Sequence, residues 1–194
     1  MTRILIGMTM ALCVVAHAEQ ACNEHVADFN PSNLIVGGRY QVVSGSNGTE
    51  ILDRRTDLIW QRCSIGQTWN GTTCAGTAVD HTWIDALKTV PAVRATINPD
   101  YRMPSIKELS TLIEIDCVKP SMNIEVFPNL PTLPKEALVT DRVPYWTSSP
   151  YVRSQTEAWR LNIWNGTMEV GNKTQKAYVR LVRAKTSDTP PVLD

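Results

Sequence analysis

The chain has 194 residues, of which 43% are hydrophobic, and its 19 basic and 19 acidic residues give a formal net charge of zero. This length supports one domain with its own core and is marginal for two. The neutral overall charge and the lack of a recognisable nucleic-acid-binding motif argue against nucleic acid as a partner.

The first 18 residues have the features of a bacterial export signal. Arg3 supplies a positive start, an apolar run follows from Ile4 to Ala16, and Ala16-His17-Ala18 fits the small-x-small cleavage pattern. The run is too short for a transmembrane segment, and no later stretch is long enough. We therefore expect a secreted, periplasmic or cell-surface protein of a bacterium. We divide the chain into a signal peptide (1–18), an N-terminal arm (19–38), one domain (39–185) and a flexible tail (186–194).

The cysteines indicate a disulfide-stapled domain. Cys13 is removed with the signal, which leaves Cys22, Cys63, Cys74 and Cys117. An even number of cysteines in an exported protein predicts two disulfides, for which three pairings are open. We favour Cys63 with Cys74, because they bracket a polar, turn-rich loop, and hence Cys22 with Cys117. A zinc site is the rival interpretation, but the chain has no Cys-x-x-Cys pair and no clustered histidines.

Short strands and turns fill the first part of the domain. The sequence predicts strands over 39–43, 49–53 and 58–62. A hairpin turn is expected at Asn47-Gly48, because Asn-Gly tolerates the positive φ that such turns need. The loop between Cys63 and Cys74 carries Trp69, which is either a platform for a sugar ring or a plug that holds the loop on the domain.

Two helix starts follow. Thr82 and Asp85 form a capping pattern, and Pro91 is expected to end or kink the helix that they begin. Its inward face consists of four side chains: Trp83, Ala86, Leu87 and Val90.

The second helix start organises the chain. Pro104 restricts the residue before it to extended geometry, and Ser105 with Glu108 completes a capping box. Arg102, at the strand-to-helix junction, is expected to be buried and hydrogen-bonded. Four apolar residues follow at helical spacing: Ile106, Leu109, Leu112 and Ile113. We expect this helix to lie on the core, with antiparallel strands on both sides of it in sequence.

The last third of the chain predicts an antiparallel meander. A long proline-rich passage after Cys117 leads to strands over 145–149, 158–164, 167–170 and 177–183. Asn165-Gly166 is the strongest hairpin signal in the chain. Strands, two helices, a long irregular loop and a meander together make the fold class α+β.

Charge is unevenly distributed along the chain. Residues 19–141 contain 15 acidic and 10 basic residues, whereas residues 142–185 contain 2 acidic and 8 basic residues. Such asymmetry either marks an anion-binding face or reflects two solvated faces that neutralise each other.

Several groups of residues occur together in the order expected for a known bacterial family. They are Asp53-x-x-Thr56-x-Leu58-x-Trp60, Arg102-Met103-Pro104 with Glu108-Leu109, Tyr145-Trp146-Thr147-Ser148-Ser149, Ala158-Trp159 with Asn165-Gly166, and Val179-Arg180-Leu181-Val182-Arg183. As a set they resemble the family named after the C-terminal domain of the Legionella collagen-like adhesin (Lcl), over about residues 40–184. The chain departs from the family pattern at Asp57 and Tyr101 and has no collagen-like repeat.

The resemblance implies an exported or surface domain with a C-type lectin-like fold. The adhesin's domain is associated with sulfated glycosaminoglycans, which would make the basic segment an anion-binding face. Calcium-dependent sugar binding is not expected, because Trp164-Asn165-Gly166 lacks the acidic residue of the lectin Trp-Asn-Asp motif. We expect no cofactor.

We therefore predict a binding module for a carbohydrate, sulfated and acidic glycans included, or for an envelope protein. Aromatic faces stack on sugars and basic groups bind sulfate or carboxylate, so the candidate contacts are Trp69, Trp164, Arg142, Arg153, Arg160, Lys173 and Lys176. The alternative is a structural subunit of a pilus, filament or envelope assembly that contacts copies of itself. We expect no enzyme, because the chain has no nucleophile elbow, phosphate loop or metal-binding histidine pair.

Overall fold

The computed structural model describes residues 20–22, 38–133, 138 and 141–186. The predicted signal peptide, most of the predicted arm and residues 187–194 of the predicted tail lie outside the described residues. No helix in the described ranges is long and apolar enough to cross a membrane.

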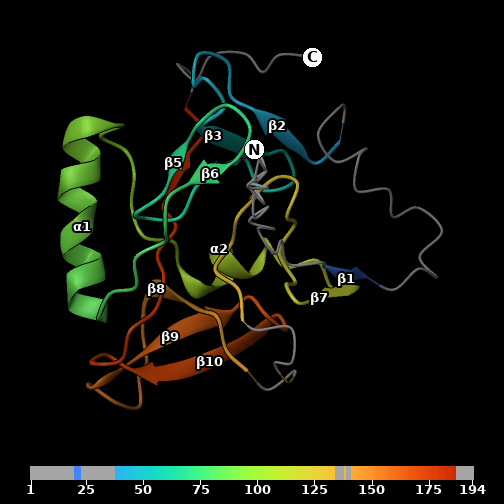
Figure 1. Ribbon diagram of the computed structural model, residues 1–194. Helices are drawn as coiled ribbons and strands as arrows, with labels where there is room; N and C mark the ends of the chain where they lie inside the picture. The colour runs from blue at the N-terminus through green and yellow to red at the C-terminus, as the bar shows by residue number, and fades with distance from the viewer. Residues whose placement is uncertain (1–19, 23–37, 134–137, 139–140, 187–194) are drawn as a thin grey trace, which may run out of the picture.

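A four-stranded antiparallel sheet joins the two ends of the domain. Its order is β11-β4-β3-β2, built from β2 (Tyr40–Val42), β3 (Glu50–Asp53), β4 (Leu58–Gln61) and β11 (Val182–Ala184). Figure 1 shows the blue-green β2 and β3 at the top of the molecule, so the start of the domain and its last strand lie in one sheet. The three strands predicted for the first part of the domain are confirmed.

A three-stranded antiparallel sheet forms the opposite end of the molecule (Figure 1). It runs in the order β10-β9-β8, from β8 (Pro144–Pro150), β9 (Glu157–Asn162) and β10 (Thr167–Asn172). The turn between β9 and β10 contains Gly166 at a φ of 76°, which favours glycine. The first three strands of the predicted meander and their Asn165-Gly166 hairpin are confirmed, whereas the fourth pairs with β4 in the other sheet.

The last predicted strand is much shorter than expected. Only Val182–Ala184 form β11, whereas residues 177–181 make single hydrogen bonds to several separate segments. Val179 accepts from the backbone N–H of Ile65 at 2.9 Å, and Ala177 exchanges hydrogen bonds with His81. Because no single neighbouring strand runs alongside this segment, its alternating apolar pattern produces buried extended chain without a regular ladder.

Helix α1 (Trp83–Thr96) begins where the sequence predicts. Thr82 caps it and accepts a hydrogen bond from the Asp85 backbone N–H, while Ala86 and Val90 are buried. Of the two expectations for Pro91, that it ends the helix is wrong, since α1 continues to Thr96, and that it kinks the helix stays a prediction. Pro91 is exposed, and the buried side chains Ala86 and Val90 on the other face keep the helix packed as it continues past the proline.

Helix α2 (Ile106–Ser110) carries the predicted capping box but is shorter than expected. The Ser105 hydroxyl accepts from the Glu108 N–H at 3.2 Å, and the Glu108 carboxylate accepts from the Ser105 N–H at 2.8 Å. Leu112 is still fully buried, although it lies beyond the helix end. The expected burial of Arg102 is wrong: its side chain is 44% exposed, because it reaches outward to form a bidentate ion pair with Glu108.

Two disulfides fasten the two two-stranded sheets, with the favoured pairing. Cys63–Cys74 closes the loop that holds β5 (Thr68–Trp69) and β6 (Cys74–Ala75). Cys22–Cys117 joins β1 (Ala21–Cys22) to β7 (Cys117–Val118), which tethers the start of the chain to the segment after α2. The zinc interpretation is therefore not needed for these cysteines.

The core has two main clusters. The larger one gathers Trp60, Leu109, Leu112, Tyr145 and other side chains from both sheets. It also takes Met122, Val126 and Phe127 from the proline-rich passage, which is thus part of the core. The second cluster packs α1 against Trp146 and Val179. The fold is α+β with antiparallel sheets; its likeness to C-type lectins stays a prediction.

Glu108 makes the capped α2 sensitive to acid. Its hydrogen bonds with Arg102 and with the Ser105 N–H lower the pKa of the carboxyl to about 2 from its ordinary 4.5. The pKa of Glu108 is lower in the folded protein than in the unfolded chain. This contact therefore stabilises the folded state fully above pH 4.5, and its contribution is lost as the pH falls toward 2. We expect Glu108→Gln to cost about 1 kcal/mol at pH 6 in urea unfolding, and much less at pH 2.

The matched control is Glu125→Gln, which replaces an exposed carboxylate that forms no ion pair with the described residues. A Glu108→Gln penalty that stays constant between pH 6 and pH 2 would contradict the assignment.

Candidate functional site

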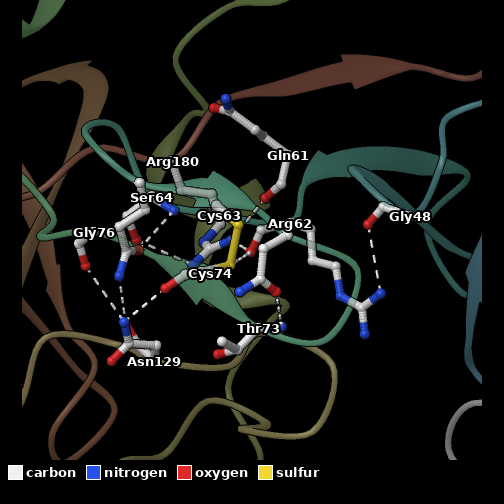
Figure 2. The surroundings of a disulfide bond; sticks show 12 residues. Gly48, Gln61, Arg62, Cys63, Ser64, Thr73, Cys74, Gly76, Asn129 and Arg180 are labelled. Carbon is white, nitrogen blue, oxygen red and sulfur yellow. Dashed lines mark hydrogen bonds between the residues drawn. A yellow bond between two sulfur atoms is a disulfide. The ribbon is translucent and has the colours of Figure 1, made fainter.

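The stapled hairpin between Cys63 and Cys74 is held rigidly on the domain. Both cysteines are buried, and Asn129 donates from its side-chain amide to the carbonyl of Cys74 at 2.6 Å. Figure 2 shows Asn129 beneath the hairpin, with its amide directed at the carbonyls of Cys74 and Gly76. The Gln67 side chain donates to the Asn129 carbonyl at 2.7 Å. The proline-rich passage and the hairpin are therefore cross-linked by amide hydrogen bonds.

A buried arginine fixes the base of the same hairpin. Arg180 is 1% exposed and donates to the carbonyls of Gln61, at 2.7 Å, and of Arg62 (Figure 2). It also donates to the Ser64 hydroxyl at 3.2 Å, and that hydroxyl pairs with the Tyr145 hydroxyl at 2.7 Å. No carboxylate of the described residues pairs with Arg180, and burial lowers the pKa of its guanidinium. The charge is compensated by backbone carbonyls, which locks the chain entering the disulfide.

Trp69 lies at the tip of the hairpin with one face already covered. The guanidinium carbon of Arg62 lies 3.7 Å from the centre of its ring, which is a stacked cation–π geometry. Arg62 is itself held by a hydrogen bond from its Nε to the Val126 carbonyl at 3.0 Å. The ring edge also touches Gly48, because a Cβ there would lie 2.6 Å from the indole nitrogen. One face of Trp69 is therefore not available to a ligand.

A polar cavity of about 280 Å³ opens between the hairpin and the proline-rich passage. Planar amides, hydroxyls and one phenol ring line it, from Gln67, Thr77, Asn129, Thr132 and Tyr178. Gly76 and Ala78 leave the space open because their side chains are small or absent. Such a lining can donate to and accept from a hydroxylated ligand and can offer one aromatic face.

A second cavity, of about 200 Å³, lies between the hairpin and the end of α1. Gln67 lines both cavities, so the hairpin separates the two. The second lining is more apolar and includes Trp69, Ile97 and Tyr101.

The structure does not bring the seven predicted contact residues together. Trp164 and Arg160 are each only 4% exposed, so neither side chain presents a surface to a ligand. Trp164 packs in the larger core cluster and donates from its indole N–H to the Leu138 carbonyl. Trp69 is on β5, far from β9 and β10 in Figure 1.

Most of the basic segment is neutralised by partners from elsewhere in the chain. Ion pairs join Arg142 and Arg160 to Glu169, Lys176 to Asp80, Arg183 to Glu50 and Lys185 to Asp57. Lys173 lies 4.6 Å from the centre of the Trp83 ring. The guanidinium carbon of the buried Arg180 lies 4.7 Å from the centre of the Phe127 ring. Within the described part of the chain, Arg153 is the one basic residue of 142–185 with neither an ion pair nor a ring contact. The predicted charge asymmetry thus corresponds mainly to internal pairing, and not to a free basic face.

The residues that line the polar cavity were not predicted from the sequence. Gln67, Asn129 and Tyr178 come from three segments that are distant in sequence, and none of them belongs to a motif. The one available signal was the pair of bracketing cysteines, since a stapled polar loop is a common place for recognition. In the described ranges, no three acidic, histidine or cysteine side chains are grouped as a metal site.

A family model for the Lcl C-terminal domain matches residues 49–183, which is more than half of the chain. The chain belongs to the Lcl C-terminal domain family. The match covers the three-stranded sheet, both helices, the stapled hairpin and the four-stranded sheet except for β2 and the last residue of β11. All residues that line the two cavities lie within the matched range. No curated protein matches the chain. Family membership indicates an extracellular, adhesion-related module, and two disulfides fit an extracellular or periplasmic compartment.

Proposed function

We propose that this chain is an exported binding module that recognises a neutral carbohydrate through the polar cavity beside the stapled hairpin, without catalysing a reaction. The observation that carries the proposal is the lining of that cavity. Sugar hydroxyls both donate and accept hydrogen bonds, and amides and hydroxyls of the cavity wall offer both functions in fixed positions. The cavity of about 280 Å³ is close to the lower end of the range for small-molecule sites, which suits one or two sugar units.

The rigidity of the cavity wall supports carbohydrate binding at this site. Gln67 and Asn129 are held by hydrogen bonds to the backbone, and the disulfide holds the hairpin that carries Gln67. A ligand therefore meets groups that are already ordered, and less conformational entropy is lost on binding.

The ion pairs of the basic residues in 142–185 favour a neutral glycan as the ligand over a sulfated or acidic one. Binding of sulfate groups relies on free guanidinium and ammonium groups. The basic side chains of residues 142–185 are mostly used in ion pairs, and Arg160 and Arg183 are buried. Among the described residues, none of those that line the polar cavity is charged.

The test is a glycan array followed by titration of the best neutral ligand into the mature protein and two variants. Ala78→Tyr places a ring in the polar cavity and is expected to weaken binding at least tenfold. Ala95→Tyr adds the same ring at an exposed position on α1 and is expected to change nothing. Binding should also be insensitive to salt, because no ion pair forms.

Two outcomes would contradict this proposal. One is equal affinity of both variants for the neutral glycan. The other is tight, salt-sensitive retention on heparin that is lost when Arg142 and Arg153 are replaced by glutamine. The alternative of a structural subunit stays a prediction, and light scattering on the concentrated mature chain tests it.

A further inference from the structure

The cavity between the hairpin and α1 is large enough for one aromatic ring. Its volume is about 200 Å³, and a buried apolar cavity of about 150 Å³ binds benzene. A single ring with a small substituent therefore fits, whereas a disaccharide does not. The volume alone therefore restricts the ligand to about one substituted ring.

The walls of this cavity are mainly apolar and aromatic. Trp69 contributes a partly exposed ring, Ile97 closes the side toward α1, and the buried Tyr101 and Cys63 also border the cavity. Tyr101 is fully buried and its hydroxyl donates to the Glu50 carboxylate at 2.8 Å, so it offers a ligand no polar group. Arg62 covers one face of Trp69 and leaves the other for stacking. Aromatic rings pack on such walls in offset or edge-to-face arrangements.

One polar group on the wall has no partner. The Gln61 side-chain oxygen is buried without a hydrogen bond, and the Gln61 amide nitrogen makes none to the described residues. By contrast, each amide group of Gln67 already has one partner: its oxygen accepts from the Ser64 N–H and its nitrogen donates to the Asn129 carbonyl. An unsatisfied buried amide costs free energy that a ligand bearing a matching donor or acceptor recovers.

We propose that this cavity is a second binding site, which takes a single aromatic ring carrying one hydrogen-bonding group, as in a phenol or an indole. The ring lies against Trp69 and Ile97, and its hydroxyl or N–H bonds the Gln61 amide. The site is separate from the polar cavity and does not depend on carbohydrate binding there.

The first test uses p-cresol and 3-methylindole as probes, titrated into the full mature protein by calorimetry. Ile97→Asp removes an apolar wall and is expected to weaken binding of both probes about tenfold. Ile84→Asp is the matched control, because Ile84 and Ile97 are similarly exposed, at 49% and 56%, and only Ile97 lines the cavity. No binding of either probe at millimolar concentration, or equal losses in the two variants, would overturn the proposal.

The second test isolates the polar contact. We expect the wild type to bind p-cresol several-fold more tightly than toluene, and Gln61→Leu to bind the two equally. Leucine has a similar size, and the Gln61 carbonyl that accepts from Arg180 is retained. The same p-cresol preference in Gln61→Leu would exclude Gln61 as the polar partner and overturn that part of the proposal.

A final comparison separates the two sources of such a ring. Free p-cresol and the tripeptide Gly-Tyr-Gly are titrated in parallel. A tripeptide that binds as well as p-cresol indicates a tyrosine side chain of a protein partner, whereas binding of free p-cresol alone indicates a small aromatic molecule; both results support the site. Ala78→Tyr leaves p-cresol binding unchanged, so failure of the carbohydrate proposal and failure of this one are distinguishable.

Discussion

Replacing Arg183 with leucine is expected to lower the free energy of unfolding by about 3–5 kcal/mol, because it leaves a buried carboxylate without its partner. Arg183 is 5% exposed and Glu50 is 8% exposed. Two parallel bonds join them, from Nε to Oε1 at 2.8 Å and from Nη2 to Oε2 at 2.6 Å. Tyr101 donates a third bond to Glu50, and burial raises the pKa of its hydroxyl. Urea unfolding at pH 7 measures the loss.

The control for this prediction is Arg153→Leu, which alters an exposed arginine without an ion pair and is expected to change stability by less than about 0.5 kcal/mol. The double variant Glu50→Gln/Arg183→Leu should recover part of the loss, since it removes the stranded charge. A loss in Arg183→Leu as small as that in Arg153→Leu would show that the pair contributes little.

Removing the Cys22–Cys117 disulfide by alanine substitution of both cysteines is expected to cost about 4–5 kcal/mol. The two cysteines are 95 residues apart, so the crosslink removes many conformations from the unfolded chain. The Cys63–Cys74 crosslink spans only 11 residues, and its removal is expected to cost about 3 kcal/mol by the same reasoning. Urea unfolding of the two double variants under oxidising conditions measures both losses.

The order of these two losses is the informative result. If the short crosslink contributes more than the long one, then rigid packing of the hairpin outweighs the loop entropy. Retention of the Cys63–Cys74 bond in the Cys22/Cys117 variant is checked by mass spectrometry, so that mispaired protein is excluded from the comparison.

The sequence alone determined the local structure of this protein. The capping box of Ser105 and Glu108, the cap at Thr82 and the Asn165-Gly166 hairpin involve residues a few positions apart, where the spacing itself decides the geometry. The favoured disulfide pairing followed from one short loop that needed closing. These features predicted the α+β class and most of the strands.

Only the tertiary structure decided which polar groups are free. Arg183 pairs with Glu50 across 133 positions, and Arg180 binds carbonyls about 118 positions away, so neither partner is visible in a local window of sequence. An arginine that looks available for an anion is neutralised once a distant carboxylate or carbonyl packs against it, because a buried charge is stable only when it is paired. The two cavities arose in the same way, from segments that meet only in the folded chain at the stapled hairpin.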